Sequence, residues 1–234
     1  MGIFREMARI LYPWPINCRC CGENTYDDHV LCPACRREIR NDGATWGFAK
    51  APITRSVAAH HYTEMSREMV RLLKYNSLSD LAIEMADDMI QAAERADIVH
   101  PDIITYVPMH ARRRRQKFFD QAEVLARHVA AAVQMQDSKA LKRVRYSRQQ
   151  ARTRGYAARM KNVENAFSVQ QDVEGKHVLL IDDVYTTGAT SSECARVLME
   201  AGACRVDLMV YAIAADPPEG TEDAYSHADG INMQ

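Results

Sequence analysis

The stretch VLLIDDVYTTGAT, at residues 178–190, constrains the fold of this chain more than any other feature. Its apolar start predicts a buried strand that ends in two acids, Asp182 and Asp183. A Thr/Gly turn follows, and a helix-forming segment comes after the turn. Backbone amides at the start of a helix bind phosphate, and paired carboxylates accept hydrogen bonds from vicinal hydroxyls. The stretch therefore predicts a strand–turn–helix unit that holds a sugar phosphate.

Hydrophobic periodicity along the chain predicts strands that alternate with helices. The expected strands are 56–62, 102–108, 177–184 and 204–214. The expected helices are 65–75, 81–96, 120–135 and 190–201, the last of which ends at Gly202. Residues 138–161 have no clean period and are expected to form a mobile loop with some helix. The alternation predicts an α/β fold with a parallel sheet flanked by helices.

Length and composition limit the class of protein. The 234 residues are enough for one α/β domain with a core and a small added module. No run approaches the ~20 apolar residues that span a bilayer, and the N-terminus has no signal-peptide pattern. We therefore expect a cytoplasmic protein without an integral membrane span. It should have three parts: a cysteine-rich module at 1–45, the α/β domain at 50–215 and an acidic, disordered tail at 216–234.

Five of the seven cysteines lie in the first 35 residues, and four of them form two CxxC pairs: Cys18, Cys21, Cys32 and Cys35. A CxxC turn places two thiolates ~3.7 Å apart, as a tetrahedral zinc site with ~2.3 Å Zn–S bonds requires. Four protein ligands leave no open position, so the predicted site is structural and adds folding energy to a small module. Cys20 is an extra thiol that is either free or replaces Cys18 or Cys21 as a ligand. A redox pair or inert buried thiols are the alternatives to zinc.

The net charge of −1 hides an uneven distribution. Residues 111–161 contain fifteen Lys and Arg and only three acids, a net charge of +12, whereas the rest of the chain carries −13. Such a basic segment favours a polyanionic partner. Aromatic residues interleave with it, as stacking platforms for single-stranded DNA do: Phe118, Phe119, Tyr146 and Tyr156. The alternative is a solvated, arginine-rich helix and loop whose aromatic residues pack in the core.

These patterns resemble a known family. VLLIDDVYTTGAT resembles the phosphoribosyl-pyrophosphate (PRPP) motif of type I phosphoribosyltransferases, and with the cysteine pairs the chain resembles the ComF (ComFC) competence family over most of residues 10–215. Residues 108–123, PMHARRRRQKFFDQAE, are similar to the family pattern P-L-H-x-R-R-x-R-x-R-G-F-N-Q-A-E. A second family pattern, Arg-x-x-Asn-Val followed by Ala-Phe, matches within residues 159–167.

The resemblance implies a type I phosphoribosyltransferase fold and a role for each matching residue. Asp182 and Asp183 would be the catalytic pair, binding the ribose hydroxyls directly or through Mg²⁺. The turn residues that would hold the 5′-phosphate of PRPP are Thr186, Thr187, Gly188, Ala189 and Thr190. The basic residues that would hold pyrophosphate are Arg112, Arg113 and Arg115. The arginine-rich stretch 141–159 would be the loop that closes over the site.

The departures from the family pattern that matter for binding are Phe118 in place of Gly and Asp120 in place of Asn, and Lys117 stands for Arg. Glycine permits a close backbone approach or a positive φ, and Phe118 does not. Ribose-phosphate binding therefore rests on an intact motif, whereas the pyrophosphate side has changed residues.

Two functions follow from the resemblance. The first is an enzyme that transfers phosphoribosyl from PRPP to a nitrogen acceptor and releases pyrophosphate, with an acceptor that the sequence does not identify. A role in DNA uptake, with a competence helicase as partner, is implied by the family alone. The alternative is a non-catalytic competence factor that senses PRPP or a nucleotide and binds single-stranded DNA.

Overall fold

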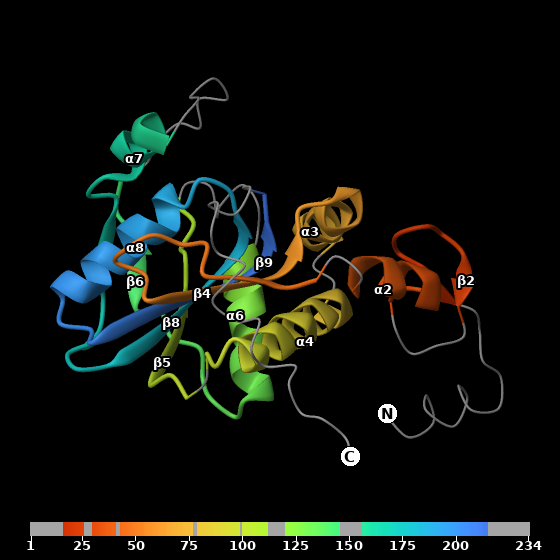
Figure 1. Cartoon of the computed structure of the whole chain (residues 1–234), viewed down its shortest axis with the longest axis horizontal. Coiled ribbons are helices and arrows are strands. Elements are labelled where there is room, and N and C mark those ends of the chain that lie inside the picture. Colours follow the sequence, from red (N-terminus) through yellow and green to blue (C-terminus); the bar gives the residue numbers. More distant parts are fainter. Residues whose placement is uncertain are drawn as a thin grey trace, which may run out of the picture.

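A computed structural model gives the structure of the chain and describes residues 16–25, 30–40, 43–76, 79–98, 100–111, 120–145 and 156–214. The elements form an α/β body, with a small cysteine-rich module at one end of its longest axis (Figure 1). The sheet is mainly parallel, which confirms the predicted fold class. Within the described ranges, no helix combines the length and the apolar character needed to cross a membrane.

The central sheet has five strands in the order β3-β4-β9-β8-β5. They are β3 (Thr45–Trp46), β4 (Arg55–His61), β9 (Arg205–Ile213), β8 (His177–Tyr185) and β5 (Ile103–Tyr106). The last four run parallel, and β3, at one edge, is antiparallel to β4. All four strands predicted from the sequence are present.

Helices cover both faces of this sheet (Figure 1). One face is covered by α4 (Ser79–Arg95) and α6 (Gln121–Ala132), and the other by α8 (Ala189–Glu200). Two further helices, α3 (Glu64–Asn76) and α7 (Tyr156–Val163), lie beside α4 and α8 respectively. The helices predicted at 65–75, 81–96, 120–135 and 190–201 are confirmed, with ends that differ by a few residues.

The composition of β8 follows from this arrangement. Leu179 and Ile181 pack in the core under α4 and α6, whereas Val178 and Leu180 pack in the core under α8. A parallel strand that is covered on both faces has an unbroken apolar run rather than an alternating one. This is why residues 178–181 predict a central strand so strongly.

The predicted glycine at the end of α8 is also confirmed. The amide of Gly202 donates to the Met199 carbonyl (3.0 Å), and the amide of Ala203 donates to the Leu198 carbonyl (3.1 Å), as in a Schellman motif. Gly202 has φ = +94°, and a Cβ there would overlap the Glu174 carboxylate. Glycine therefore lets the chain turn sharply from α8 into β9.

One prediction is wrong, because the stretch expected to be a loop contains a strand. β6 (Leu141–Arg143) pairs antiparallel with β7 (Phe167–Val169). β6 has three residues, and two of them are Lys and Arg, so it shows no apolar alternation. The partial helix predicted in this stretch is present as α7, and residues 146–155 lie outside the described residues.

The cysteine-rich module packs on α3 and α4. It consists of the antiparallel pair β1 (Ile16–Asn17) and β2 (Asn24–Thr25), followed by α2 (Pro33–Arg40). The amide of Val30 donates to Glu84 Oε1 of α4 at 2.8 Å. Leu31 and Ile39 are buried in the same core cluster as Met69 of α3. The tail predicted at 216–234 lies outside the described residues.

Candidate functional site

The carboxyl ends of β5 and β8 form the candidate ligand site. β8 lies between β5 and β9 and runs parallel to both. The next described helix after β5 is α6, on one face, and β8 leads into α8 on the other face (Figure 1). In open parallel sheets, ligands bind in the crevice where neighbouring strands lead to opposite faces. The structure brings Asp182, Asp183 and the Thr/Gly turn to this point.

Gly188 makes the tight turn between β8 and α8 possible. It is the N-cap of α8, with φ = +72° and ψ = 0°. A Cβ at this position would overlap the ring and hydroxyl of Tyr185. Tyr185 is itself buried and packs edge-to-face on Phe48, with 4.7 Å between ring centroids. Because the N-cap has no side chain that caps the helix, the first amides of α8 are left for an anionic ligand.

The two acids of β8 are held by their own backbone. The amide of Asp183 donates to Asp182 Oδ1 at 2.9 Å, and the amide of Val184 donates to Asp183 Oδ1 at 2.7 Å. Burial raises the pKa of Asp182 well above its usual range, and the neighbouring charge of Asp183 raises it further. The pair therefore favours a partner that neutralises or shares negative charge, such as a hydroxyl donor or a cation.

Asp120 adds a third acid, and its structural role is not evident from the sequence. It is only 5% exposed, and its Oδ2 accepts the amide N–H of Met109, three residues beyond β5, at 2.6 Å. Burial raises its pKa to about 6 against the lowering effect of the Met109 amide, and the charges of Glu123 and Asp183 add to the rise. Asp120 thus fixes the segment after β5 and places negative charge near the β8 acids.

Several predicted site residues lie outside the described residues. These are the predicted pyrophosphate ligands Arg112, Arg113 and Arg115, and the substituted positions Lys117 and Phe118. The same holds for Phe119 and Tyr146, and for the side chain of Tyr156, so the predicted stacking platforms stay predictions.

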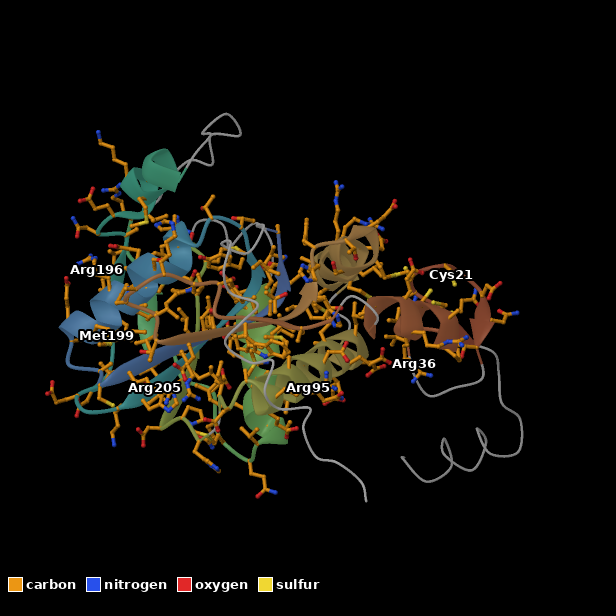
Figure 2. All side chains as sticks on the ribbon, viewed as in Figure 1. Cys21, Arg36, Arg95, Arg196, Met199 and Arg205 are labelled. Atoms are coloured by element: carbon orange, nitrogen blue, oxygen red, sulfur yellow. The ribbon has the colours of Figure 1, made fainter. Side chains whose placement is uncertain are left out.

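Glu193 of α8 is a buried residue that the sequence did not single out. It is 1% exposed, and its Oε1 accepts the amide N–H of Asn165 at 2.6 Å and a hydrogen bond from Arg196 at 2.7 Å. Burial raises its pKa, but the bonds from Arg196 and Asn165 outweigh burial and lower it. Figure 2 shows Arg196 on α8. Glu193 therefore ties the turn after α7 to the helix that begins at the candidate phosphate turn. In the sequence, the i, i+3 spacing of Glu193 and Arg196 is the signal from which this ion pair could have been predicted.

The described part of the basic segment includes α6, β6 and the start of α7, and β6 pairs with β7. Lys142, Arg145 and Lys161 are exposed, and Arg145 donates to the Lys161 carbonyl at 3.2 Å at the end of α7. The Arg143 guanidinium lies 5.3 Å from the centre of the Phe167 ring. Part of the positive charge is therefore on the surface beside α8, where a polyanion has access to it.

The four paired cysteines converge in the N-terminal module. The sulfur atoms of Cys18, Cys21, Cys32 and Cys35 all lie within 4.8 Å of one another. The Cys21 and Cys32 sulfurs are 3.7 Å apart, which equals the edge of a tetrahedron with ~2.3 Å Zn–S bonds. Sulfur atoms gather beside the labelled Cys21 in Figure 2. The four cysteines fit a closed, structural metal site such as a zinc site.

Backbone donors prepare this cluster for a metal ion. Cys18 Sγ accepts the amide N–H of Cys32 at 3.3 Å, and Cys32 Sγ accepts that of Cys35 at 3.5 Å. Burial raises the pKa of Cys18, but backbone donors at Cys21, Cys32 and Cys20 outweigh burial and lower its pKa to about 6. The thiolate, which is the form that binds metal, is therefore favoured at this position.

Several known proteins are similar to this chain in sequence. Residues 120–233 match the family described as "Phosphoribosyl transferase domain". DNA utilization protein YhgH of Escherichia coli (strain K12) is 29% identical over 211 residues, which cover 87% of this chain and 92% of that protein. Competence protein ComFC of Bacillus subtilis (strain 168) is 24% identical over 189 residues, covering 74% of this chain and 72% of that protein. A solved allosteric regulatory enzyme of purine biosynthesis is 25% identical with a TM-score of 0.41, over 62% of this chain and 30% of that chain.

These matches define the class of protein first: the chain contains a phosphoribosyl transferase domain, here joined to a four-cysteine module. More particularly, it is a homologue of proteins named DNA utilization protein YhgH and competence protein ComFC. The family resemblance predicted from the sequence is confirmed.

Proposed function

We propose that the chain binds PRPP at the carboxyl ends of β5 and β8. The observation that carries the proposal is the β8–α8 turn, where Gly188 leaves the helix amides free beside the paired acids. Asp182 and Asp183 accept hydrogen bonds from the ribose hydroxyls. The residues that surround the 5′-phosphate are Thr186, Thr187, Gly188, Ala189 and Thr190.

Charge supports Mg²⁺ as part of the ligand. Three acids lie near one another: Asp120 and Asp182 have raised pKa values, and the charge of Asp183 contributes to both. Together they would repel a bare polyanion such as PRPP. Carboxylate oxygens are ligands that Mg²⁺ prefers, so Asp182 and Asp183 are suited to hold it with the substrate. Bound there, Mg²⁺ would neutralise charge on pyrophosphate. We assign the other end of the pyrophosphate to Arg112, Arg113 and Arg115.

The reaction that this site favours is displacement of pyrophosphate at the anomeric carbon of PRPP by a nitrogen nucleophile. Its transition state resembles an oxocarbenium ion, so the positive charge develops on the ribose ring. Carboxylates beside the ring stabilise that charge without forming a covalent bond. The site then contributes to catalysis by orienting ribose, binding the leaving pyrophosphate and excluding water.

The names of the relatives support a setting in DNA uptake or use. YhgH is named a DNA utilization protein and ComFC a competence protein. We assign the chain to the cytoplasm, where cysteines serve as metal ligands more often than in disulfides. The cysteine cluster is assigned to structural zinc.

Calorimetry with PRPP and MgCl₂ tests the binding proposal. Replacing Asp182 and Asp183 together by Asn should weaken PRPP binding by roughly tenfold or more, since two charge-assisted hydrogen bonds are lost. Glu164→Gln is the matched control, because this exposed acid lies outside the site. Equal affinities for the wild type and the double variant would refute the proposed site.

A second function is favoured by the exposed cations beside α8. In that alternative, PRPP or a nucleotide is a sensed ligand, and the +12 segment binds single-stranded DNA and works with a competence helicase. Pyrophosphate release with ammonia or a nucleobase as donor distinguishes an enzyme from a sensor. DNA anisotropy at low and high salt, with and without PRPP, tests the second function. A lack of DNA binding at low salt would exclude it.

A further inference from the structure

Tyr62 is an exposed aromatic residue at the carboxyl end of β4, on the same edge of the sheet as the candidate ligand site. It is 39% exposed, whereas the tyrosines of β5, β8 and β9 are buried in the core. Its amide donates to the Ile213 carbonyl at 2.8 Å, so the backbone stays paired with β9 as far as this residue. The ring of Tyr62 is therefore available to a ligand that lies across the ends of the strands.

The turn that carries Tyr62 is held by a buried serine. Ser66 of α3 is fully buried, and its hydroxyl donates to the His61 carbonyl at 2.6 Å. The same hydroxyl accepts the amide N–H of Thr63 at 2.9 Å. The residues on both sides of Tyr62 are thus fixed to one side chain. A backbone that is ordered before binding reduces the entropy lost when a ligand contacts the ring.

The register of the sheet places Tyr62 level with the candidate phosphate turn. The amide of Ala214, which follows β9, donates to the Tyr185 carbonyl at 2.8 Å, immediately before Thr186. Tyr62, Ala214 and Thr186 therefore lie in one row across the strand ends. Two strand spacings separate the backbone of Tyr62 from that of Thr186, or about 10 Å. A ribose that carries a flat substituent bridges a gap of this kind.

The stereochemistry of the proposed transfer decides the side from which the acceptor arrives. In that function, pyrophosphate lies toward the basic segment that follows β5, on one side of β8. The nitrogen lone pair attacks the anomeric carbon from the opposite side, and the new C–N bond forms as the C–O bond to pyrophosphate breaks. Pyrophosphate leaves with the electron pair of that bond, and the proton of the nitrogen passes to water. The strands on the opposite side of β8 are β9 and β4.

We propose that the acceptor is a planar nitrogen heterocycle that stacks on the ring of Tyr62. The inference rests on the proposed PRPP function and adds the class of its acceptor. Aromatic side chains stack on flat heterocycles through their ring faces. Ammonia, the other simple nitrogen donor, has no face to stack and gains nothing from an exposed ring. Tyr62 thus orients the acceptor, and the paired acids of β8 hold the ribose.

Binding of the product tests this inference without any need for turnover. Transfer to a heterocycle gives a nucleoside 5′-monophosphate, so calorimetry should compare AMP, GMP, CMP and UMP with ribose 5-phosphate on the full-length protein. At least one of the four should bind the wild type about fivefold or more tightly than ribose 5-phosphate, as stacking of one base on an aromatic ring gives. Tyr62→Ala should lose this preference and keep its affinity for ribose 5-phosphate. Tyr62→Phe, which retains the ring, should keep both.

Val133→Ala is the control, because Val133 is an exposed apolar residue beside Pro101, at the amino ends of the strands. It should bind every ligand as the wild type does. A wild type that binds neither PRPP nor ribose 5-phosphate would refute the proposed site and the inference with it. Binding of ribose 5-phosphate with no preference for any of the four monophosphates would overturn the inference alone. An unchanged preference in Tyr62→Ala, or an equal loss of affinity for ribose 5-phosphate and the monophosphates, would also overturn it.

Discussion

At the scale of single residues, buried carboxylates have opposite electrostatic environments on the two sides of the site. Asp120 is surrounded by other acids, and burial with these charges raises its pKa to about 6. Glu193 is surrounded by donors, which lower its pKa despite burial. The first carboxylate therefore costs stability at neutral pH, whereas the second one contributes stability. Each gives a prediction with a definite sign.

Asp120→Asn should stabilise the protein at pH 7. The pKa of Asp120 rises from an ordinary ~3.9 to about 6 on folding, so wild-type stability falls as the pH rises through this interval. Asn keeps an oxygen that accepts the Met109 amide but has no charge. We expect a gain of about 1–3 kcal/mol in the free energy of unfolding at pH 7 and almost none at pH 4. Urea unfolding at both values measures it.

Asp172→Asn, at an exposed acid away from the site, is the control for Asp120→Asn and should change stability little at either pH. Equal stability of Asp120→Asn and the wild type at pH 7 would contradict the environment described for Asp120. A gain of the same size at pH 4 would show that packing, rather than charge, is responsible.

Glu193→Gln should destabilise the protein by about 1–3 kcal/mol at pH 7, because charge-assisted hydrogen bonds from Arg196 and Asn165 are lost inside the molecule. The lowered pKa means that this stabilisation is present above the ordinary pKa of Glu and is lost as the pH falls through the folded-state value. The difference from the wild type should therefore shrink in acid. Denaturant unfolding at pH 7 and pH 3.5 measures this.

Glu200→Gln is a matched control for Glu193→Gln, because Glu200 also binds Arg196, at 2.6 Å, but its side chain is 62% exposed. An exposed pair of this kind is worth about 0–1 kcal/mol, so this variant should resemble the wild type. If the two variants lost equal stability, burial of Glu193 would not be the source of its effect.

At the scale of elements, the sequence predicts a helix or strand when turn residues mark its ends or when it is buried on both faces. β8 is predicted because residues 178–181 are apolar throughout, and α8 because its turn and its end are marked by Gly188 and Gly202. β6 is not predicted, because its pairing with β7 depends on a partner beyond α7. The contact of Asp120 with Met109 is missed for the same reason. The spacing of residues along the chain thus predicts turns and cysteine pairs, but it does not predict contacts between segments that only folding brings together.

Gly188→Ala tests whether the turn between β8 and α8 needs a glycine. The added Cβ would overlap Tyr185, and alanine would have to adopt φ = +72°, a left-handed conformation that it disfavours. We expect a loss of about 2–4 kcal/mol in stability and PRPP affinity lowered by roughly tenfold or more. Thermal unfolding and calorimetry with PRPP and MgCl₂ measure the two effects.

Gly175→Ala is the control for Gly188→Ala, since Gly175 has φ = +64° and no atom within 4 Å of an added Cβ. This variant should lose only the ~1 kcal/mol of the left-handed conformation and should bind PRPP as the wild type does. Wild-type affinity in Gly188→Ala would argue against phosphate binding at this turn.

At the scale of the whole molecule, the cysteine-rich module and the α/β domain share one hydrophobic core. Cys18, Leu31 and Ile39 of the module are buried in the cluster that contains Met69 of α3 and Leu81 of α4. The amide of Val30 also donates to Glu84 of α4. A module that is packed in this way cannot unfold without exposing apolar surface of the domain. The metal site should therefore stabilise the entire described fold rather than its N-terminal part alone.

Removal of zinc by a chelator, or the change Cys32→Ser, should accordingly lower the melting temperature of the main unfolding transition. A loss of about 3–5 kcal/mol corresponds to roughly 6–20 °C for a chain of this size. Calorimetry should give a single transition at the lower temperature, and added zinc should reverse the shift for the chelated wild type but not for Cys32→Ser. Cys204→Ser, which leaves the cluster intact, should melt as the wild type does. If the main transition stayed in place while only a minor one vanished, the module would be an independent unit. The shared core would then have no energetic consequence for the α/β domain.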